Sequence, residues 1–202
     1  MNPFTKLTAI AAPLEMANID TDKIIPARVL RKLRGPGYEK LAFHDIRYDA
    51  DGNDRPDFVL NQAPYRNAKI LVAGANFGCG SSREAAVYVL YDYGIRSVIA
   101  PSFGDIHYGN ELQNGMLPVV LPDATCRKLC QQLRDQPGAQ IGIDLEAQMV
   151  TGPDGATYRF DIDPNHRERL LKGLDDIGLV MQNITAIEAF ERRHHSELPW
   201  LA

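Results

Sequence analysis

The stretch Val72-Ala-Gly-Ala-Asn-Phe-Gly-Cys-Gly-Ser-Ser-Arg-Glu84 lies between an apolar run and a helical pattern. Residues 69–73, Lys-Ile-Leu-Val-Ala, have the length and composition of a buried strand, and residues 85–93 carry apolar side chains around most of a helix. The turn therefore joins the end of a strand to the start of a helix. Gly78 and Gly80 can adopt positive φ, and the first amides of a helix have no partner within it, so an anion can bind them.

Ser81, Ser82 and Arg83 follow the glycines directly. An arginine guanidinium pairs with a carboxylate through two parallel hydrogen bonds, so this order favours a carboxylate-binding site. A second interpretation is purely structural, because Ser81 and Glu84 have the spacing of a helix capping box. A nucleotide loop is disfavoured, since the stretch lacks Gly-Lys-Ser/Thr and has Arg83 where a dinucleotide fingerprint needs its third glycine.

The composition of the 202 residues is that of an ordinary globular protein, with 45% hydrophobic and 24% charged residues. We expect one compact domain over residues 1–202. A net charge of −4 argues against a general nucleic-acid or anionic-membrane surface. Apolar runs are too short for a membrane span, and the N-terminal residues lack the apolar region of a secretory signal. We therefore expect a cytoplasmic protein.

Three cysteines are too few for a disulfide framework, and none belongs to a Cys-x-x-Cys pair. Cys126 and Cys130 fall with Leu129 and Leu133 on one face of a helix predicted to follow Asp123, so we interpret them as core residues. Cys79 lies inside the glycine turn, where it could be exposed and oxidised. One such thiol cannot hold an iron–sulfur cluster, so any cluster must be carried by another chain.

The pattern after residue 69 predicts an α/β core, with further buried strands at 97–100 and 117–121. Between them, a loop and a short helix contain His107 and Asn110 at helical spacing, either satisfied locally or in contact with a ligand. A β-hairpin is predicted from 141–150 and 157–162 around Gly-Pro-Asp-Gly at 152–155.

Two helices are predicted after the hairpin. Asp163 is expected to cap the first, with Pro164 at its first position and its end near Gly173. Thr185 and Glu188 have the spacing of a capping box for the last helix.

Residues 28–64 are rich in Gly, Pro, Asp and Arg, with Tyr38, Phe43 and Phe58 as occasional apolar anchors. They predict a long, partly structured excursion, which is more often functional than structural. Just before it, Asp20 and Asp22 flank Thr21 in a segment typical of a turn with Asx capping.

Three segments in this order resemble one family: residues 18–26 (Asn-Ile-Asp-Thr-Asp-Lys-Ile-Ile-Pro), residues 76–84 (Asn-Phe-Gly-Cys-Gly-Ser-Ser-Arg-Glu), and residues 99–106 (Ile-Ala-Pro-Ser-Phe-Gly-Asp-Ile) with the later Gly-Asn and Leu-Pro-Val. They look like the small subunit of 3-isopropylmalate dehydratase, the swivel domain of the aconitase superfamily. The second segment is highly specific, and the likeness extends over nearly the whole chain. It implies a single swivelling β/β/α domain of the aconitase C-terminal type.

The resemblance implies a shared active site. A separate large subunit would hold a 4Fe-4S cluster, whose open iron acts as Lewis acid on a small dicarboxylic acid, while this chain closes over the other face. In this family Ser81 would be the base, and Ser82 and Arg83 would bind a substrate carboxylate. Asp22 lies in the first of the three segments and is a further candidate for substrate binding. By position, the excursion would contact the variable group of the substrate through Arg31 and Arg34.

One departure concerns the substrate. Family members commonly have His after Ser-Arg-Glu, whereas this chain continues with Ala85-Ala-Val-Tyr-Val-Leu. Because a changed neighbouring helix can reshape a pocket, the small subunit of a related hydro-lyase for homoaconitate, citraconate or a methylated malate is a second hypothesis. A non-catalytic carboxylate-binding assembly module is a third.

Overall fold

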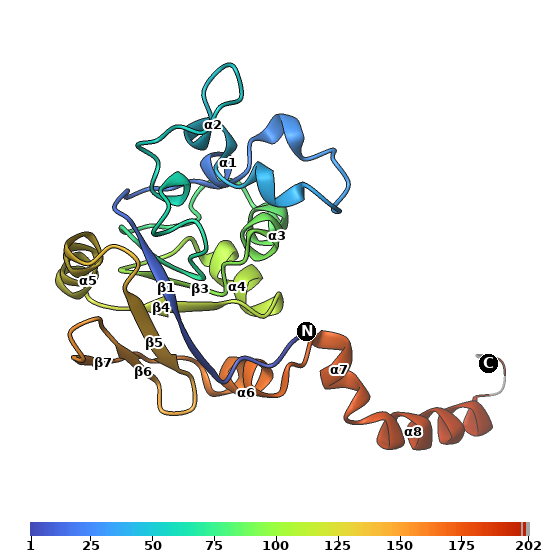
Figure 1. The fold of residues 1–202 in the computed structure, drawn as a ribbon. Coiled ribbons are helices and arrows are strands. Elements are labelled where there is room, and N and C mark those ends of the chain that lie inside the picture. Colours follow the sequence, from blue (N-terminus) through green and yellow to red (C-terminus); the bar gives the residue numbers. More distant parts are fainter. Residues whose placement is uncertain (199, 201–202) are drawn as a thin grey trace.

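The computed structural model describes residues 1–198 and 200, and its centre is a seven-stranded mixed sheet (Figure 1). The middle strand is β1 (Lys6–Leu14). On one side of β1 the strands are parallel, in the order β2 (Ile70–Ala73), β3 (Ser97–Ala100) and β4 (Leu117–Val120). On the other side they are antiparallel: β5 (Gln140–Asp144), β6 (Met149–Thr151) and β7 (Thr157–Arg159). The predicted α/β core and its three buried strands are confirmed.

The parallel half of the sheet is covered on both faces, which explains its unbroken apolar strands. Ile70 and Val72 of β2 point to the core beneath α5 (Asp123–Asp135). Leu71 and Ala73 point to the opposite core, where α3 (Glu84–Tyr93) packs. Between β3 and β4, α4 (Asp105–Gln113) lies beside α3 and β4. None of the described helices is long and apolar enough to cross a membrane.

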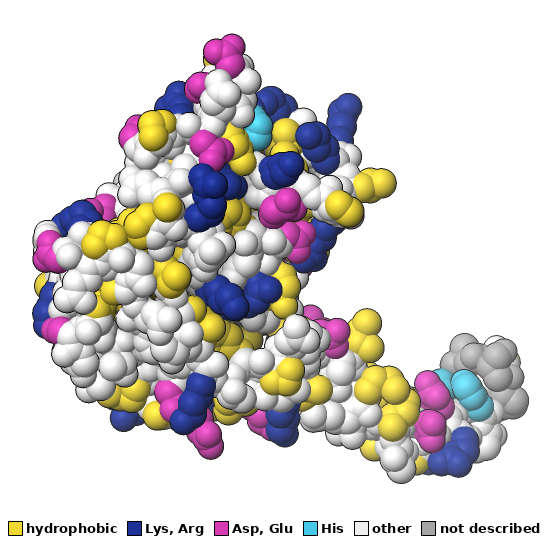
Figure 2. Space-filling model, in the orientation of Figure 1, with side chains coloured by type: hydrophobic (Ala, Val, Ile, Leu, Met, Phe, Trp, Pro, Cys, Tyr) yellow, Lys and Arg dark blue, Asp and Glu magenta, His cyan; other side chains and the backbone are white. Residues whose placement is uncertain are grey.

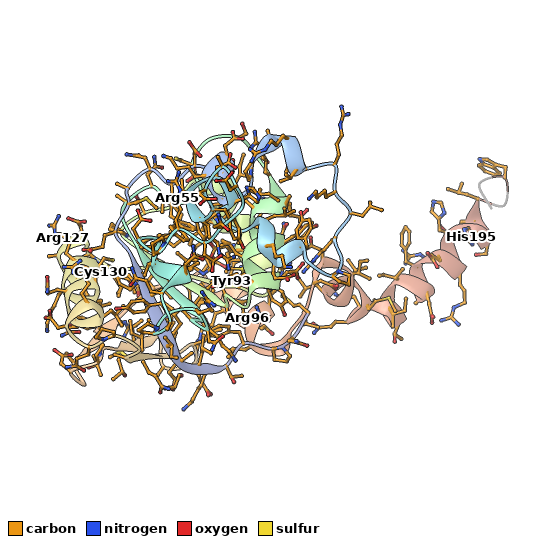
Figure 3. All side chains as sticks on the ribbon, turned by 45° about the horizontal axis from the view of Figure 1, so that its top comes forward. Arg55, Tyr93, Arg96, Arg127, Cys130 and His195 are labelled. Atoms are coloured by element: carbon orange, nitrogen blue, oxygen red, sulfur yellow. The ribbon has the colours of Figure 1, made fainter. Side chains whose placement is uncertain are left out.

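The apolar stripe of α5 is confirmed. Cys126, Leu129, Cys130 and Leu133 are all buried, and the Cys130 thiol donates to the carbonyl oxygen of Val72 at 3.5 Å. Figure 3 shows Cys130 on the sheet side of α5 and Arg127 on its outer side. The helix begins at Asp123 itself, one residue earlier than predicted.

The excursion folds into short helical turns, one of which packs against α3 (Figure 1). In chain order after α1 (Thr21–Ile24), these turns are η1 (Ala27–Val29), η2 (Tyr38–Leu41), α2 (His44–Arg47) and η3 (Val59–Asn61). Tyr38, Phe43 and Phe58 are buried, as expected for anchors.

The predicted hairpin is partly wrong, because residues 141–150 form two strands. β5 ends at Asp144, whose carboxylate accepts a hydrogen bond of 2.8 Å from the Ala147 amide and so closes a turn before β6. The next helix, α6 (Pro164–Lys172), confirms its prediction. The Asp163 carboxylate accepts from two amides of its first turn, and Gly173 ends it with φ of +67°.

The chain then leaves the body as α7 (Asp176–Met181) and α8 (Ile184–Glu197), which project outward as an arm (Figure 1). His195 lies far out on this arm in Figure 3. The predicted capping box at Thr185 is wrong, because α8 begins one residue before it. Gln182 is already helical in φ and ψ, so the chain enters α8 without an extended residue to be capped. Residues 199, 201 and 202 of the expected domain lie outside the described residues.

Candidate active site

A hollow of about 200 Å³ opens where β2 and β3 end. Parallel strands present their carboxyl ends on one edge, where sites commonly form in open α/β sheets. Three segments far apart in sequence meet here. The lining residues are Thr21, Gly78, Cys79, Gly80, Ser81, Ser82, Arg83, Gly104, Asp105, Ile106 and His107.

The glycine turn is packed tightly against the segment that follows β3. Phe77 donates to the carbonyl of Ser102 at 3.0 Å, and Gly104 donates to the carbonyl of Phe77 at 2.8 Å. A Cβ on Gly104 would lie 2.7 Å from the carbonyl oxygen of Gly78. A Cβ on Gly78, where φ is +70°, would overlap the ring of His107. Both positions therefore require glycine.

The opposite side of the turn is held by Ile19 and by Thr21, the first residue of α1. Gly78 donates to the carbonyl of Ile19 at 2.7 Å, and Thr21 donates to the carbonyl of Cys79 at 2.9 Å. The hydroxyl of Thr21 donates to the carbonyl of Ser81 at 2.8 Å. From its neighbours, Thr21 was expected as part of an Asx turn. Its place in residues 18–26, the first of the three segments that carry the family resemblance, was the sequence signal for a role at this site.

The capping-box interpretation of Ser81 is wrong. α3 begins at Glu84 with Arg83 in the N-cap position, and no side chain among the described residues caps it. Ser81 and Ser82 are both exposed. Their hydroxyls therefore remain available to a ligand, close to the free amides of the first turn of α3.

Arg83 forms an ion pair with Asp22, so these two predicted site residues are brought together. The Arg83 side chain is only 15% exposed, whereas that of Asp22 is 54% exposed. The hydrogen bond from Arg83 is the main cause that lowers the pKa of the Asp22 carboxyl below its usual range. Asp22 thus pairs with Arg83, the predicted carboxylate-binding residue, while its own negative charge disfavours direct contact with a substrate carboxylate.

Arg34 is not brought to the hollow. Its guanidinium donates to Asp92 from Nε at 2.8 Å and from Nη2 at 2.6 Å, and it lies over the ring of Tyr88, 4.7 Å from the centroid. Arg34 thereby ties the excursion to α3. Arg31 is exposed on the same segment, and Ala85 packs against the core beneath α3 rather than lining the hollow.

Three family models match successive parts of the chain. The Aconitase C-terminal domain model matches residues 1–124. The LeuD_N model matches 127–164, and the model of the C-terminal domain of the 3-isopropylmalate dehydratase small subunit matches 176–202. The 3-isopropylmalate dehydratase small subunit of Parvibaculum lavamentivorans is 51% identical and covers all of both chains. The chain belongs to the 3-isopropylmalate dehydratase small subunits.

Other members of this family are similar over the same length. The small subunit of Gluconacetobacter diazotrophicus is 53% identical over 99% of this chain and 97% of its own. A solved 3-isopropylmalate dehydratase structure from Methanocaldococcus jannaschii has the same fold, with a TM-score of 0.66, 24% identity, and coverage of 92% of this chain and 99% of its own. The resemblance stated from the three sequence segments, and the aconitase C-terminal fold it implied, are confirmed.

The described cysteines of this family member do not fit an iron–sulfur cluster. Cys126 and Cys130 are buried in the core, and burial raises the pKa of both thiols to about 12. Cys79 stands alone in the hollow. Within residues 1–198 and 200, three or more His, Cys, Asp or Glu side chains nowhere gather as a metal site.

Proposed function

We propose that this chain is the small subunit of a 3-isopropylmalate dehydratase, a hydro-lyase that interconverts 2-isopropylmalate and 3-isopropylmalate in leucine biosynthesis. The observation that carries the proposal is that Ser81, Ser82 and Arg83, which follow one another in the sequence, line one hollow. The full-length relatives of the chain are named 3-isopropylmalate dehydratase small subunits. A cytoplasmic location remains part of the proposal.

Ser81 is the proposed base. It would remove the proton on the carbon next to a substrate carboxylate, and the electron pair of that C–H bond would form the double bond as hydroxide leaves the adjacent carbon. When water adds back with its hydroxyl on the carbon that lost the proton, and its proton on the carbon that lost the hydroxide, the hydroxyl has moved by one carbon. A serine becomes basic only where its alkoxide is stabilised. The amides at the start of α3 and the Arg83 charge are the groups near enough to do this.

Ser82 and Arg83 are proposed to bind the substrate carboxylate. The guanidinium of Arg83 uses one nitrogen, Nη1, on Asp22, so donors remain for a ligand. In this arrangement Asp22 orients the clamp. Holding the carboxylate in one place puts the acidic proton beside Ser81, and such positioning can account for several orders of magnitude in rate.

The partner is proposed to be a large subunit that carries a 4Fe-4S cluster and supplies Lewis-acid assistance to the departing hydroxyl. This chain would contribute the other wall of the closed site and exclude water from it. We place the contact face around the hollow, because Thr21, Ser81 and His107 all open onto it.

Arg31 remains the candidate for contact with the variable group of the substrate. An arginine favours a carboxylate on that group, whereas an isopropyl group needs apolar contacts. The exposed position of Arg31 leaves it able to meet either the substrate or the large subunit.

The test is an anaerobic hydratase assay of the chain with its co-purified large subunit, offering 2-isopropylmalate, homoaconitate and citraconate side by side. Ser81→Ala should abolish turnover while the domain keeps its stability, and Ser196→Ala, on the exposed face of α8, is the matched control. Arg83→Lys should also be severely impaired, because a single ammonium cannot reproduce a two-pronged clamp.

The outcomes separate the three hypotheses. Preference for isopropylmalate supports the leucine enzyme, and preference for a triacid or a smaller acid supports the related hydro-lyase, with Arg31 and Ala85 as specificity determinants. Near-normal rates in Ser81→Ala would remove Ser81 from the mechanism. Failure to co-purify with any iron–sulfur protein would favour the assembly module.

A further inference from the structure

A buried acid–base pair lies beneath the hollow. Nε2 of His107 is 3.0 Å from Oε1 of Glu111, one turn further along α4, and the two side chains are 1% and 0% exposed. Neither group forms a well-aligned hydrogen bond with any part of the chain that the structure describes. Burial of two ionisable groups with so few partners is costly, and a native structure that keeps them needs a reason.

His107 connects this pair to the reacting turn. Its ring occupies the space that a side chain at position 78 would need, so that an ideal Cβ on Gly78 would overlap it. The ring also packs edge-on against Phe77, with centroids 5.4 Å apart. Ser81 lies three residues beyond Gly78 on the same turn. Glu111 stands behind the ring, outside the lining of the hollow.

The two sides of the turn are held differently. The Ile19–Thr21 side supplies three hydrogen bonds, to Gly78, Cys79 and Ser81. On the α4 side, the backbone of Gly104 lies against the carbonyl of Gly78, and the ring of His107 fills the space that a side chain at position 78 would need. The turn on that side therefore packs against the ring, and the ring contacts Glu111.

Other charged and titratable groups surround the pair. Asp105 on α4 and Cys79 and Arg83 on the turn share the hollow with His107. Tyr108 is the neighbour of His107 on α4, and Glu84 on α3 accepts a hydrogen bond of 3.0 Å from Asn114 at the end of α4. Burial raises the pKa of the Glu111 carboxyl, and among all these groups only His107 opposes the shift. His107 and Glu111 thus behave as one unit.

We propose that His107 is a positioning residue for the reaction, held by Glu111 against Gly78 so that the turn keeps Ser81 at its reactive depth. This inference rests on the proposed function of Ser81. Deprotonation of Glu111 would place a charged carboxylate beside the ring in the buried interior, and the ring would move. The rate of the Ser81 step should therefore depend on the protonation of Glu111, which lies outside the lining of the hollow.

The experiment uses the complete enzyme with its large subunit and measures kcat and KM for 2-isopropylmalate as a function of pH. His107→Ala should lower kcat about 100-fold, the scale of a displacement near 1 Å, with KM changed less than about threefold because Arg83 remains. His107→Phe restores the bulk of the ring against Gly78 and should recover part of kcat. Glu111→Gln should keep most of kcat at neutral pH and move the alkaline limb of the kcat profile.

Gln113→Ala is the matched control, since it changes an exposed residue of the same helix and should match the wild type throughout. The proposal is overturned if His107→Ala loses no more activity than Gln113→Ala, or if the pH profile of Glu111→Gln superimposes on the wild-type profile. Should His107→Ala fail to fold, the Glu111→Gln profile decides alone.

Failure of this inference can be told apart from failure of the proposed function. An inactive Ser81→Ala with normal His107 and Glu111 variants rejects only the positioning role. An active Ser81→Ala rejects the base itself, whatever the pair does.

Discussion

The hydroxyl of Thr21 donates a hydrogen bond of 2.8 Å to the carbonyl oxygen of Ser81, sixty residues away in sequence. Thr21 is buried, and its own amide donates to Cys79 on the same turn. Two bonds from one residue thus fix the backbone on both sides of Gly80, whose φ of +89° is a left-handed conformation that glycine adopts without strain. Thr21 therefore holds the backbone of the proposed base from one side of the turn.

Thr21→Val should therefore impair catalysis and stability together. The substitution keeps the shape of the side chain but leaves the Ser81 carbonyl without its donor, at a cost of about 1–2 kcal/mol in the free energy of unfolding. We expect kcat to fall at least about tenfold because Ser81 is no longer held. Thr21→Ser keeps the hydroxyl and serves as the control. Equal kcat values for the Val and Ser variants would contradict the prediction.

Asp22→Asn tests the orientation of the Arg83 clamp. Arg83 lowers the pKa of Asp22, so the pair is complete above the ordinary range of aspartate and is lost only as the pH falls through the lowered value, below 3.8. At neutral pH the substitution should lower kcat/KM about tenfold by freeing the guanidinium, with no further change across the neutral range. Asp45→Asn removes the carboxylate paired with Arg28, outside the hollow, and should leave kcat/KM unchanged.

The three thiols should differ sharply in reactivity. Burial raises the pKa of Cys126 and Cys130 to about 12, so neither forms thiolate at neutral pH, while Cys79 lies in the lining of the hollow. Mass spectrometry after brief alkylation of the native protein should find label on Cys79 alone, and after unfolding on all three. Labelling of Cys126 or Cys130 at the rate of Cys79 in the native state would be incompatible with the core described above.

Removal of the arm tests how the C-terminal segment relates to the core. No residue of α7 or α8 is buried, and several large apolar side chains on it are exposed, including Ile177 and Phe190; Figure 2 shows yellow atoms along this arm. The free energy of unfolding of a chain ending at Leu174, measured in denaturant, should therefore be within about 1 kcal/mol of that of the full chain. Gly173 is kept because it packs on the N-terminal residues. A loss of several kcal/mol would show that the arm folds onto the body.

Local signals in the sequence were enough to predict the elements around the site. The strand, glycine turn and helix at residues 69–93 follow from apolar runs and glycines. The cap of α6 is equally local, because the Asp163 side chain accepts from the amide of Asn165, only two residues further on. The split between β5 and β6 was missed because Asp144 closes a turn inside a pattern that alternates like one strand. Nothing in residue spacing distinguishes that case.

The partners of the site residues were the part that sequence could not supply. Asp92 accepts hydrogen bonds from the guanidinium of Arg34, 58 residues away in sequence, and Asp22 accepts one from Arg83, 61 residues away. Such pairs depend on how α1 and the excursion pack against α3, which no local pattern encodes. The pair of His107 and Glu111 is different, because its i, i+4 spacing was visible, although its burial was not. The substrate role of Arg31 stays a prediction.

Glu111→Gln should change the pH dependence of stability with a defined sign. Burial raises the pKa of Glu111, so the folded protein keeps a proton that the unfolded chain releases above the ordinary value of 4.5. The stabilising contribution is full below that value and is lost as pH rises through the folded pKa, with a slope of up to about 1.4 kcal/mol per pH unit. Relative to the wild type, Glu111→Gln should therefore gain stability as pH rises above 4.5, measured by denaturant unfolding at a series of pH values.

Glu168→Gln is the matched control of opposite sign. Lys172 lowers the pKa of the Glu168 carboxyl on the surface of α6, so the contribution of that pair is present above 4.5 and is lost as the pH falls. Relative to the wild type, this variant should change only on the acid side. Parallel curves for Glu111→Gln and the wild type would mean that Glu111 binds no more protons in the folded protein than in the unfolded chain. Its burial would then give the folded protein no additional proton to lose as the pH rises.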